Sequence, residues 1–438
     1  GNVTAGDAQI NSAGNVMNID QSTQKAIINW QEFNVGKDAT VNFNQPGSDA
    51  ATLNRVLDSN PSQIFGRIVA PGQVILINPN GAYFAPSASV DVGGLIATTH
   101  ELADKDFLDG NYRFKRDGAT GEIINEGELK AKLDGYIALM APEVRNQGVI
   151  IAERGTVALA SGEHIQLNFG TGNKLQGITV TEQDLDAQIE NRHAIIAEGG
   201  LVILSAKATA ELRASVIKNS GQIVAKAGAN TLTQVGGRII LGGDTVQVAG
   251  TLDASSATGQ GGQIKVLGQD IELTGQSQAS PTVTASGATG GGEILIGGNY
   301  LGKGPERNAK TVSIDENTLI TADATDNGDG GRVIVWSDES TRFEGRITAR
   351  GGQEGGDGGF VETSSKKQLI VTGTVSTAAP KGEAGQWLLD PEDVEIESEE
   401  SGSEQESSEE GAAQETAAED TSEDSTTQGE EDSAAAEG

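Results

Sequence analysis

The segment that decides the fold is GGRIIL, Gly236 to Leu241, because four similar copies follow it along the chain: GGQIKV (261–266), GGEILI (291–296), GGRVIV (330–335) and GGFVET (358–363). After each glycine pair, the second and fourth residues are apolar or β-branched. This period of two is typical of a β-strand with one buried face. The glycine pair advances by 25, 30, 39 and 28 residues, a spacing at which each repeat buries its apolar face against its neighbours. The sequence therefore predicts a solenoid.

Two further alternating segments lie between successive glycine pairs, such as Val246 with Val248, then Leu252 with Ala254. Three strands per turn predict an all-β fold, a three-sided parallel β-helix. Glycine would supply left-handed or bulged corner backbone and would let successive turns stack closely. Residues 1–200 are less regular, but four of their segments read as strands: KAIINW (25–30), ATVNF (39–43), GQVILIN (72–78) and GYIALMA (135–141).

Two short helical segments are predicted as insertions on the side of the solenoid. One is residues 100–109. The other starts at Thr181, because Asp184 gives a capping pattern before Leu185 and Ile189.

Composition limits the chemistry of the chain. It has no cysteine, so disulfides, zinc ribbons and thiol catalysis are excluded. It has no apolar run of membrane-spanning length and no signal-peptide pattern. Residues 397–438 hold 16 of the 63 acidic residues and no Lys or Arg, which predicts a disordered acidic tail. The remainder still has a net charge of −17, which argues against a basic nucleic-acid surface.

Three histidines, one acidic loop and three tryptophans are the candidates for metal, catalytic or sugar-binding sites. His100, His164 and His193 lack metal or triad spacing, so we expect them at the surface or at corners. The stretch Asp323 to Asp329 lacks the spacing of an EF-hand, so we expect a corner loop, with a calcium-stabilised matrix or filament protein as an alternative. We expect Trp30, Trp336 and Trp387 to pack within strands, with sugar-binding platforms as the alternative.

A β-helix can also carry a polysaccharide-degrading enzyme, so this function is a further alternative. Such enzymes need acidic and basic residues that converge from neighbouring turns. The equivalent positions of the repeats are instead mismatched: Arg238, Gln263, Glu293, Arg332 and Phe360. We therefore predict no catalytic residues, no cofactor and no metal.

Longer segments carry a family resemblance. Three lie near the start: AIINWQEFNVG (26–36), NFNQPGSDAATLNRVLDSNPSQIFGRI (42–68) and GQVILINPNGAYFAPSASVDVGGLIATT (72–99). Together they resemble the N-terminal secretion domain of two-partner secretion exoproteins, the family of filamentous haemagglutinin and the high-molecular-weight adhesins. Three later segments resemble the stretch that follows this domain in the adhesin branch: GGRVIVWSDESTRFEGRITARGG (330–352), GGFVETSS (358–365) and GQWLLDP (385–391).

The resemblance implies a right-handed β-helix with an N-terminal cap, exported by a Gram-negative bacterium to its surface or surroundings. The POTRA domains of an outer-membrane transporter would recognise it in the periplasm, and a host-cell or matrix receptor could be the target of the whole adhesin. On this basis we expect a secretion domain at 1–200, a continuing β-helix at 201–396 and the tail at 397–438.

The resemblance also implies two secretion motifs. The family motif NPNGI matches Asn78, Pro79, Asn80 and Gly81, although Ala82 replaces its isoleucine. The second motif, NPNL, is present only as Asn44, Gln45, Pro46 and Gly47. Independently of any family, an Asn-Pro-Asn-Gly sequence after a strand favours a type I turn, because proline presets φ and the asparagine side chain can bond the backbone two residues on. The first motif can therefore be a structural turn, a recognition element, or both.

Overall fold

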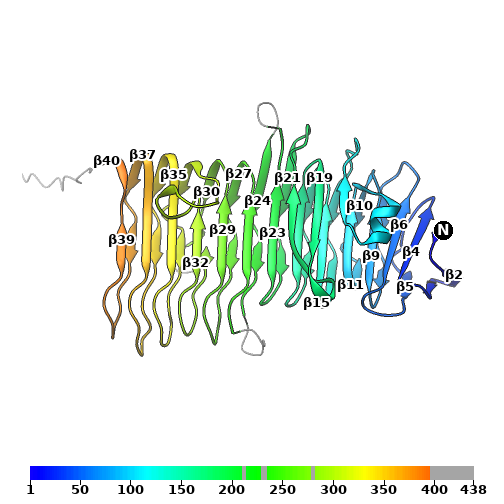
Figure 1. Cartoon of the computed structure of the whole chain (residues 1–438), viewed down its shortest axis with the longest axis horizontal. Coiled ribbons are helices and arrows are strands. Elements are labelled where there is room, and N and C mark those ends of the chain that lie inside the picture. The colour runs from blue at the N-terminus through cyan, green and yellow to red at the C-terminus, as the bar shows by residue number, and fades with distance from the viewer. Residues whose placement is uncertain (210–213, 228–233, 278–281, 395–438) are drawn as a thin grey trace, which may run out of the picture. The chain divides into compact units, whose positions relative to one another are not determined.

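The structure, a computed structural model, describes residues 1–209, 214–227, 234–277 and 282–394. These residues belong to one compact unit, Gly1–Glu395, and the predicted tail at 397–438 lies outside them. The unit is a long three-sided β-helix (Figure 1), in which 36 strands of the described ranges form one continuous hydrogen-bonded sheet. The predicted all-β solenoid with three strands per turn is confirmed.

Face A carries the repeats. Its strands, each paired in parallel with the next, are β4 (Lys25–Trp30), β6 (Ala51–Val56), β9 (Gln73–Ile77), the second parts of β11 (Ser89–Thr98) and β15 (Glu128–Met140), β18 (Thr156–Ser161), β23 (Leu201–Ala206), β26 (Arg238–Gly242), β29 (Gln263–Leu267), β32 (Glu293–Ile296), the first parts of β35 (Arg332–Phe343) and β37 (Phe360–Val371), and β39 (Gln386–Leu388).

Face B follows face A around the first corner of each turn. Its strands are β7 (Ser62–Ile64), β10 (Gly81–Phe84), β14 (Glu122–Asn125), β16 (Glu143–Asn146), β21 (Ala187–Asn191), β24 (Ser215–Asn219), β27 (Thr245–Val248), β30 (Asp270–Leu273), β33 (Ala309–Ile314), the second parts of β35 and β37, and β40 (Pro391–Val394).

Face C completes each turn. Its strands are β3 (Val16–Gln21), β5 (Thr40–Asn44), β8 (Arg67–Val69), the first parts of β11 and β15, β17 (Val149–Ile151), β22 (Ala194–Ile196), β25 (Gln222–Val224), β28 (Thr251–Asp253), β31 (Val283–Thr284), β34 (Leu319–Thr321), β36 (Arg346–Thr348) and β38 (Thr374–Ser376).

The N-terminal end of the helix is capped. Strand β1 (Asn2–Ala5) pairs antiparallel with β4, and β2 (Ala8–Ala13) forms an antiparallel hairpin with β3. Because β1 occupies the free edge of face A, the first turn presents no open edge there.

The two apolar positions that follow each glycine pair form two buried rows along the β-helix, in the register that the sequence predicts. Ile239 stacks on Ile264, Ile264 on Ile294, Ile294 on Val333, and Val333 on Val361, and all five side chains are buried. The second row holds Leu241, Val266, Ile296, Val335 and Thr363 in the same register and is equally buried.

The glycine pairs are required by close stacking, and not by left-handed backbone. A Cβ added to Gly331 would lie 2.2 Å from the carbonyl oxygen of Gly292 in the preceding turn. One added to Gly330 would lie 2.2 Å from the oxygen of Ala349 in the following turn. None of the five pairs has a positive φ, so the expectation of left-handed corners is wrong for these pairs. The second glycines form a glycine column against the backbone of the previous turn: Gly237, Gly262, Gly292, Gly331, Gly359, and then Gly385.

A buried asparagine ladder lies at the end of four face B strands. Asn125 donates through Nδ2 to Asn146 Oδ1 at 2.8 Å, Asn146 to Asn191 at 2.8 Å, and Asn191 to Asn219 at 2.7 Å. All four side chains are buried. Because each amide also serves as a partner for the next turn, the ladder satisfies polar groups that would be costly to bury alone.

A small extra-helical sheet covers part of the outer side of face A. It contains β12 (Glu101–Leu102), β13 (Arg113–Lys115), β19 (His164–Phe169) and β20 (Leu175–Val180), with the short helix α1 (Asp104–Asp109) and the 3₁₀ turn η1 (Thr171–Asn173) beside it. Buried apolar side chains pack between this sheet and face A, among them Ile75, Ile96, Phe107, Tyr136 and Ile165.

Helix α1 confirms the helical insertion predicted within residues 100–109. The helix predicted from Thr181 is wrong, because Ile189 belongs to β21, where it is buried between Val144 and Ile217 in the ladder of face B. Hydrogen bonding on both sides of this strand outweighs the local capping pattern. Thr181 instead closes the β19–β20 hairpin by accepting a hydrogen bond from His164 N at 3.0 Å.

Candidate functional site

The Asn-Pro-Asn-Gly motif joins β9 on face A to β10 on face B. Gly81 N donates to Asn78 O at 2.9 Å, which closes a β-turn. Asn78 Oδ1 accepts from Asn80 N at 3.0 Å, the contact from the asparagine side chain to the backbone two residues on. The motif is therefore a built turn at the first corner of its coil.

The Asn78 side chain is buried and ties this turn to the preceding coil. Its side chain is 1% exposed. Its Nδ2 donates to Asn60 O at 2.9 Å and to Ser62 Oγ at 3.1 Å, both in the preceding coil. The amide is therefore fully engaged inside the protein and is not available to a partner.

Pro79 and Asn80, by contrast, are exposed. Asn80 Nδ2 donates to Asp58 O at 2.9 Å, and Pro79 O accepts from Gly121 N at 3.3 Å. The turn is thus held between residues 58–62 of one coil and residues 120–122 of the next. A Cβ on Gly81 would lie 2.4 Å from Glu122 O, so glycine is required there by the coil above.

These neighbours form one exposed surface, which we call the turn patch and define by residues 58–61, 79–80 and 120–122. A shallow groove crosses it, with Ser59, Pro61, Asn80, Thr120 and Glu122 on its walls. The sequence does contain a signal for residues 58–61, because Asn60-Pro61 is a second Asn-Pro pair. It lies in the coil that precedes Asn78-Pro79.

The second motif lies elsewhere. Residues 44–47 are at the corner from face C to face A, where Gln45 is 9% exposed. Gln45 Nε2 donates to Gln73 O at 2.9 Å and to Thr52 Oγ1 at 2.8 Å, and its Oε1 accepts from Gly72 N at 2.9 Å. Since Gln73 begins β9 and Asn78 follows it, the two motifs lie at opposite ends of that strand, roughly 17 Å apart at about 3.3 Å per residue. The structure does not bring them together.

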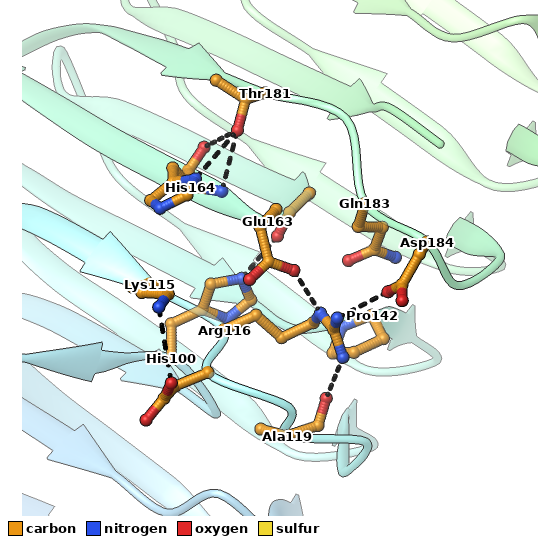
Figure 2. A network of polar contacts seen from close by, with 12 residues as sticks. His100, Lys115, Arg116, Ala119, Pro142, Glu163, His164, Thr181, Gln183 and Asp184 are labelled. Atoms are coloured by element: carbon orange, nitrogen blue, oxygen red, sulfur yellow. Dashed lines mark hydrogen bonds and ion pairs between the residues drawn. The ribbon is translucent and has the colours of Figure 1, made fainter. Parts of the chain in front are cut away.

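The polar network of Figure 2 centres on Arg116 and adjoins the turn patch. The Arg116 side chain is 9% exposed, and its Nε and Nη2 lie 2.7 Å from Glu163 and 2.6 Å from Asp184. Its Nη1 donates to Ala119 O at 3.3 Å, directly before Thr120. The network therefore fixes one edge of the turn patch to the extra-helical sheet. Sequence reasoning missed it, because its partners are 47 and 68 residues away.

His100 lies beside this network, at a corner, which is one of its two expected positions, but it is not at the surface. Its side chain is fully buried at the point where the chain leaves β11 for β12. Its Nε2 lies 2.7 Å from Gly162 O, and burial lowers its pKa to about 4. His164 and His193 are exposed, as expected. Within the described ranges, no group of three or more His, Cys, Asp or Glu residues could hold a metal ion.

His100 predicts a pH-dependent stability. Because its folded pKa is depressed to about 4 and its unfolded pKa is about 6.5, the unfolded state binds more protons between these values. The free energy of unfolding should then fall by on the order of 3 kcal/mol as pH drops from 6.5 to 4. His100→Gln should remove this part of the slope in urea unfolding measured across that range. The exposed-histidine control, His193→Gln, should retain it, and equal slopes in wild type and His100→Gln would contradict the assignment.

The predicted corner loop at Asp323 to Asp329 is present. Asp323 is 7% exposed and accepts from Arg350 Nη2 at 2.8 Å and from Thr348 Oγ1 at 3.0 Å. Asp329 Oδ1 accepts from Asp357 N at 2.8 Å. These two carboxylates therefore hold neighbouring loops together.

Two of the three tryptophans pack as expected. Trp30 and Trp336 are 5% and 6% exposed. Trp387 lies in β39 in register with buried Val361, and it is 38% exposed in the last described coil of face A. Among the described residues, no helix is long and apolar enough to cross a membrane.

Comparison with known proteins identifies relatives. Two heme/hemopexin-binding proteins of Haemophilus influenzae match. One, from strain Rd, is 31% identical over 254 residues, 56% of this chain and 27% of that protein. The other is 29% identical over 255 residues, 53% of this chain and 26% of that protein. This chain thus spans about a quarter of the length of these relatives.

A solved structure and a family model agree with these matches. The crystal structure of the HMW1 secretion domain from Haemophilus influenzae superposes with a TM-score of 0.76 at 29% identity, covering 89% of this chain and 99% of that one. The model of the TPS secretion domain matches residues 1–234, which include the cap, the turn patch and the extra-helical sheet. The chain therefore belongs to the family of TPS secretion domains, the secretion domains of two-partner secretion exoproteins.

Proposed function

We propose that this chain is the export-directing region and proximal shaft of an exoprotein that a cognate outer-membrane transporter carries to the cell surface or beyond it. The observation that carries the proposal is the family match over residues 1–234, a range that includes the cap and the turn patch. The strands that follow residue 234 continue the same ladder, as a shaft requires.

We further propose that the POTRA domains of the transporter contact the turn patch. Three features support this assignment. Pro79 and Asn80 are exposed. The coils on both sides hold the turn, one through the Asn80 side chain and the other through Pro79 O. The Arg116 network fixes the adjacent segment. A surface that is already rigid loses little conformational entropy when a partner binds. Asn78 and Gln45 would act through the shape of their turns, because their side chains are buried.

For the whole exoprotein we propose adhesion to a host-cell or matrix receptor as the function. The name of the matched relatives, heme/hemopexin-binding protein, makes a heme-carrying host protein one candidate ligand. We propose no catalytic role. The equivalent positions on face A do form one column, but Gln263 Nε2 donates to Glu293 Oε2 at 2.6 Å, and Phe360 places a phenyl ring after Arg332.

The test is secretion of the full chain beside its transporter. The chain should reach the cell surface or the medium when the intact transporter is present and should remain in the periplasm when the transporter lacks its POTRA domains. An unrelated exoprotein with its own intact transporter serves as the control for general export. Equal export without the transporter would overturn the proposed function, and equal export without the POTRA domains would overturn only the proposed contact.

A further inference from the structure

Residues 297–308, which we call the flap, depart from the regular coil. They connect β32 on face A to β33 on face B, where the two preceding coils, from β26 to β27 and from β29 to β30, use a short corner. This insertion accounts for the 39-residue spacing between the third and fourth glycine pairs. Instead of turning directly, the chain folds back over the outer side of face A, as the loop between the labels β30 and β35 in Figure 1 shows.

The flap covers an apolar cluster. Leu295, Ile334 and Trp336 are buried on the outer side of face A, with Phe360 packed against them. Gly302 of the flap lies on the indole, since a Cβ there would be 2.4 Å from Trp336 Cε2. The Tyr300 ring meets the Phe360 ring edge-on at 5.7 Å. Without the flap, an aromatic surface would face solvent.

A buried carboxyl group holds the tip of the flap. Glu362, in β37 on the outer side of face A, is 0% exposed. Both of its carboxylate oxygens lie 3.2 Å from Leu301 N. Burial is the main cause that raises the pKa of Glu362, and Asp390 adds to it, while Leu301 N, the Ser364 hydroxyl and Arg332 act in the opposite direction.

The flap is also strained and hinged. Leu301 has a φ of 54°, a left-handed conformation that side chains other than glycine, asparagine and aspartate seldom adopt. Glycines in left-handed conformation stand around it, with φ of 76° at Gly297, 62° at Gly302 and 117° at Gly304. A closed conformation of this kind persists only while its contacts outweigh the strain.

We propose that the flap is a hinged cover that closes over Trp336 when Glu362 carries a proton and loosens when Glu362 is ionised. Closing removes the carboxyl group from water, and an ionised carboxylate opposes this removal far more than a neutral acid does. The sign follows from this preference: the closed flap is most stable at acid pH and loses stability as pH rises. Loosening exposes Trp336 and Phe360 beside the Glu362 carboxylate and the Arg332 guanidinium, whereas in acid this surface is hidden.

The test is hydrogen exchange of the flap in the full chain, corrected for the intrinsic pH dependence of amide exchange. Protection of residues 297–308 should fall by roughly threefold or more between pH 4 and pH 7. Glu362→Gln, a neutral isostere, should abolish this change and keep the protection at its acid level. Glu354→Gln serves as the control, because Glu354 is exposed and paired with Lys381, and it should behave as wild type.

Two results would overturn the proposal: wild-type protection that is constant with pH, or a decline in Glu362→Gln equal to that of wild type. If Glu362→Gln does not fold, the proposal is tested with Ser364→Ala instead. That substitution removes a hydroxyl that favours the ionised form, so it should move the midpoint of the change to higher pH, and an unmoved midpoint would refute the role of Glu362. This experiment does not measure export, so a failure of the flap proposal would leave the proposed function unaffected.

Discussion

An Asn80→Ala variant is expected to accumulate in the periplasm while keeping the fold and melting temperature of the wild-type chain. The side chain is exposed and makes one contact outside its own motif, from Nδ2 to Asp58 O at 2.9 Å, so its removal should cost about 1 kcal/mol of stability. If Asn80 is central to the contact with the transporter, the loss of binding is ~2 kcal/mol or more. Export, measured as the ratio of protein in the medium to protein in the periplasm, should then fall by roughly tenfold or more.

Asn168→Ala is the matched control for this experiment. Asn168 is an exposed asparagine on β19 with one side-chain contact, to Thr179 Oγ1 at 3.4 Å, and it lies outside the turn patch. Its variant should be exported normally. Normal export of a folded Asn80→Ala protein would remove Asn80 from the recognition surface and leave the motif with a structural role alone.

A Gly331→Ala variant is expected to lose stability, because the added methyl group would overlap the backbone of the preceding coil. The new Cβ would lie 2.2 Å from Gly292 O and 2.8 Å from Gly291 C, so two stacked coils must separate. Overpacking of this kind costs about 1–3 kcal/mol or more, and in a solenoid the cost falls on the interface between neighbouring repeats. Chemical unfolding should show a lower midpoint, and hydrogen exchange should show the coils on both sides of Gly331 opening first.

Gly242→Ala provides the comparison, because a Cβ on Gly242 would meet nothing within 4 Å and its φ is not positive. This variant should be neutral or more stable by about 0.4–1 kcal/mol, through reduced freedom of the unfolded chain. Equal destabilisation by the two substitutions would show that loss of glycine itself, and not contact between coils, is responsible.

The repeat could be predicted from sequence because its determinants are local. Two apolar positions follow each glycine pair, and both the strand register and the buried rows follow from that pattern. Close stacking of the glycines is predicted from the sequence and is confirmed, but the backbone atoms that each glycine meets could not be predicted, since they lie in coils 25 to 39 residues away. The asparagine ladder does have a local sequence signal, because three of its corners share the pattern Asn-x-Gly: NEG (125–127), NQG (146–148) and NSG (219–221).

The candidate site was predicted less completely than the fold. The turn at Asn78 to Gly81 follows from the chemistry of its residues, whereas the turn patch depends on stacking with residues 58–61 and 120–122, which only the folded coils bring together. For the same reason His100 and Arg116 could not be placed: their partners lie in segments joined by the extra-helical sheet. The division at residue 200 remains a prediction, since β18, β23 and β26 pair continuously across it.

The antiparallel strand β1 closes the edge at which the first coil begins, and this closure gives the rod a direction of growth. On face A, a coil that has formed can therefore accept a new neighbour only on its C-terminal side. Each later coil then builds on a finished template. If the proposed transporter delivers the chain from its N-terminus, we expect a rod sealed at its first coil to lengthen by folding alone.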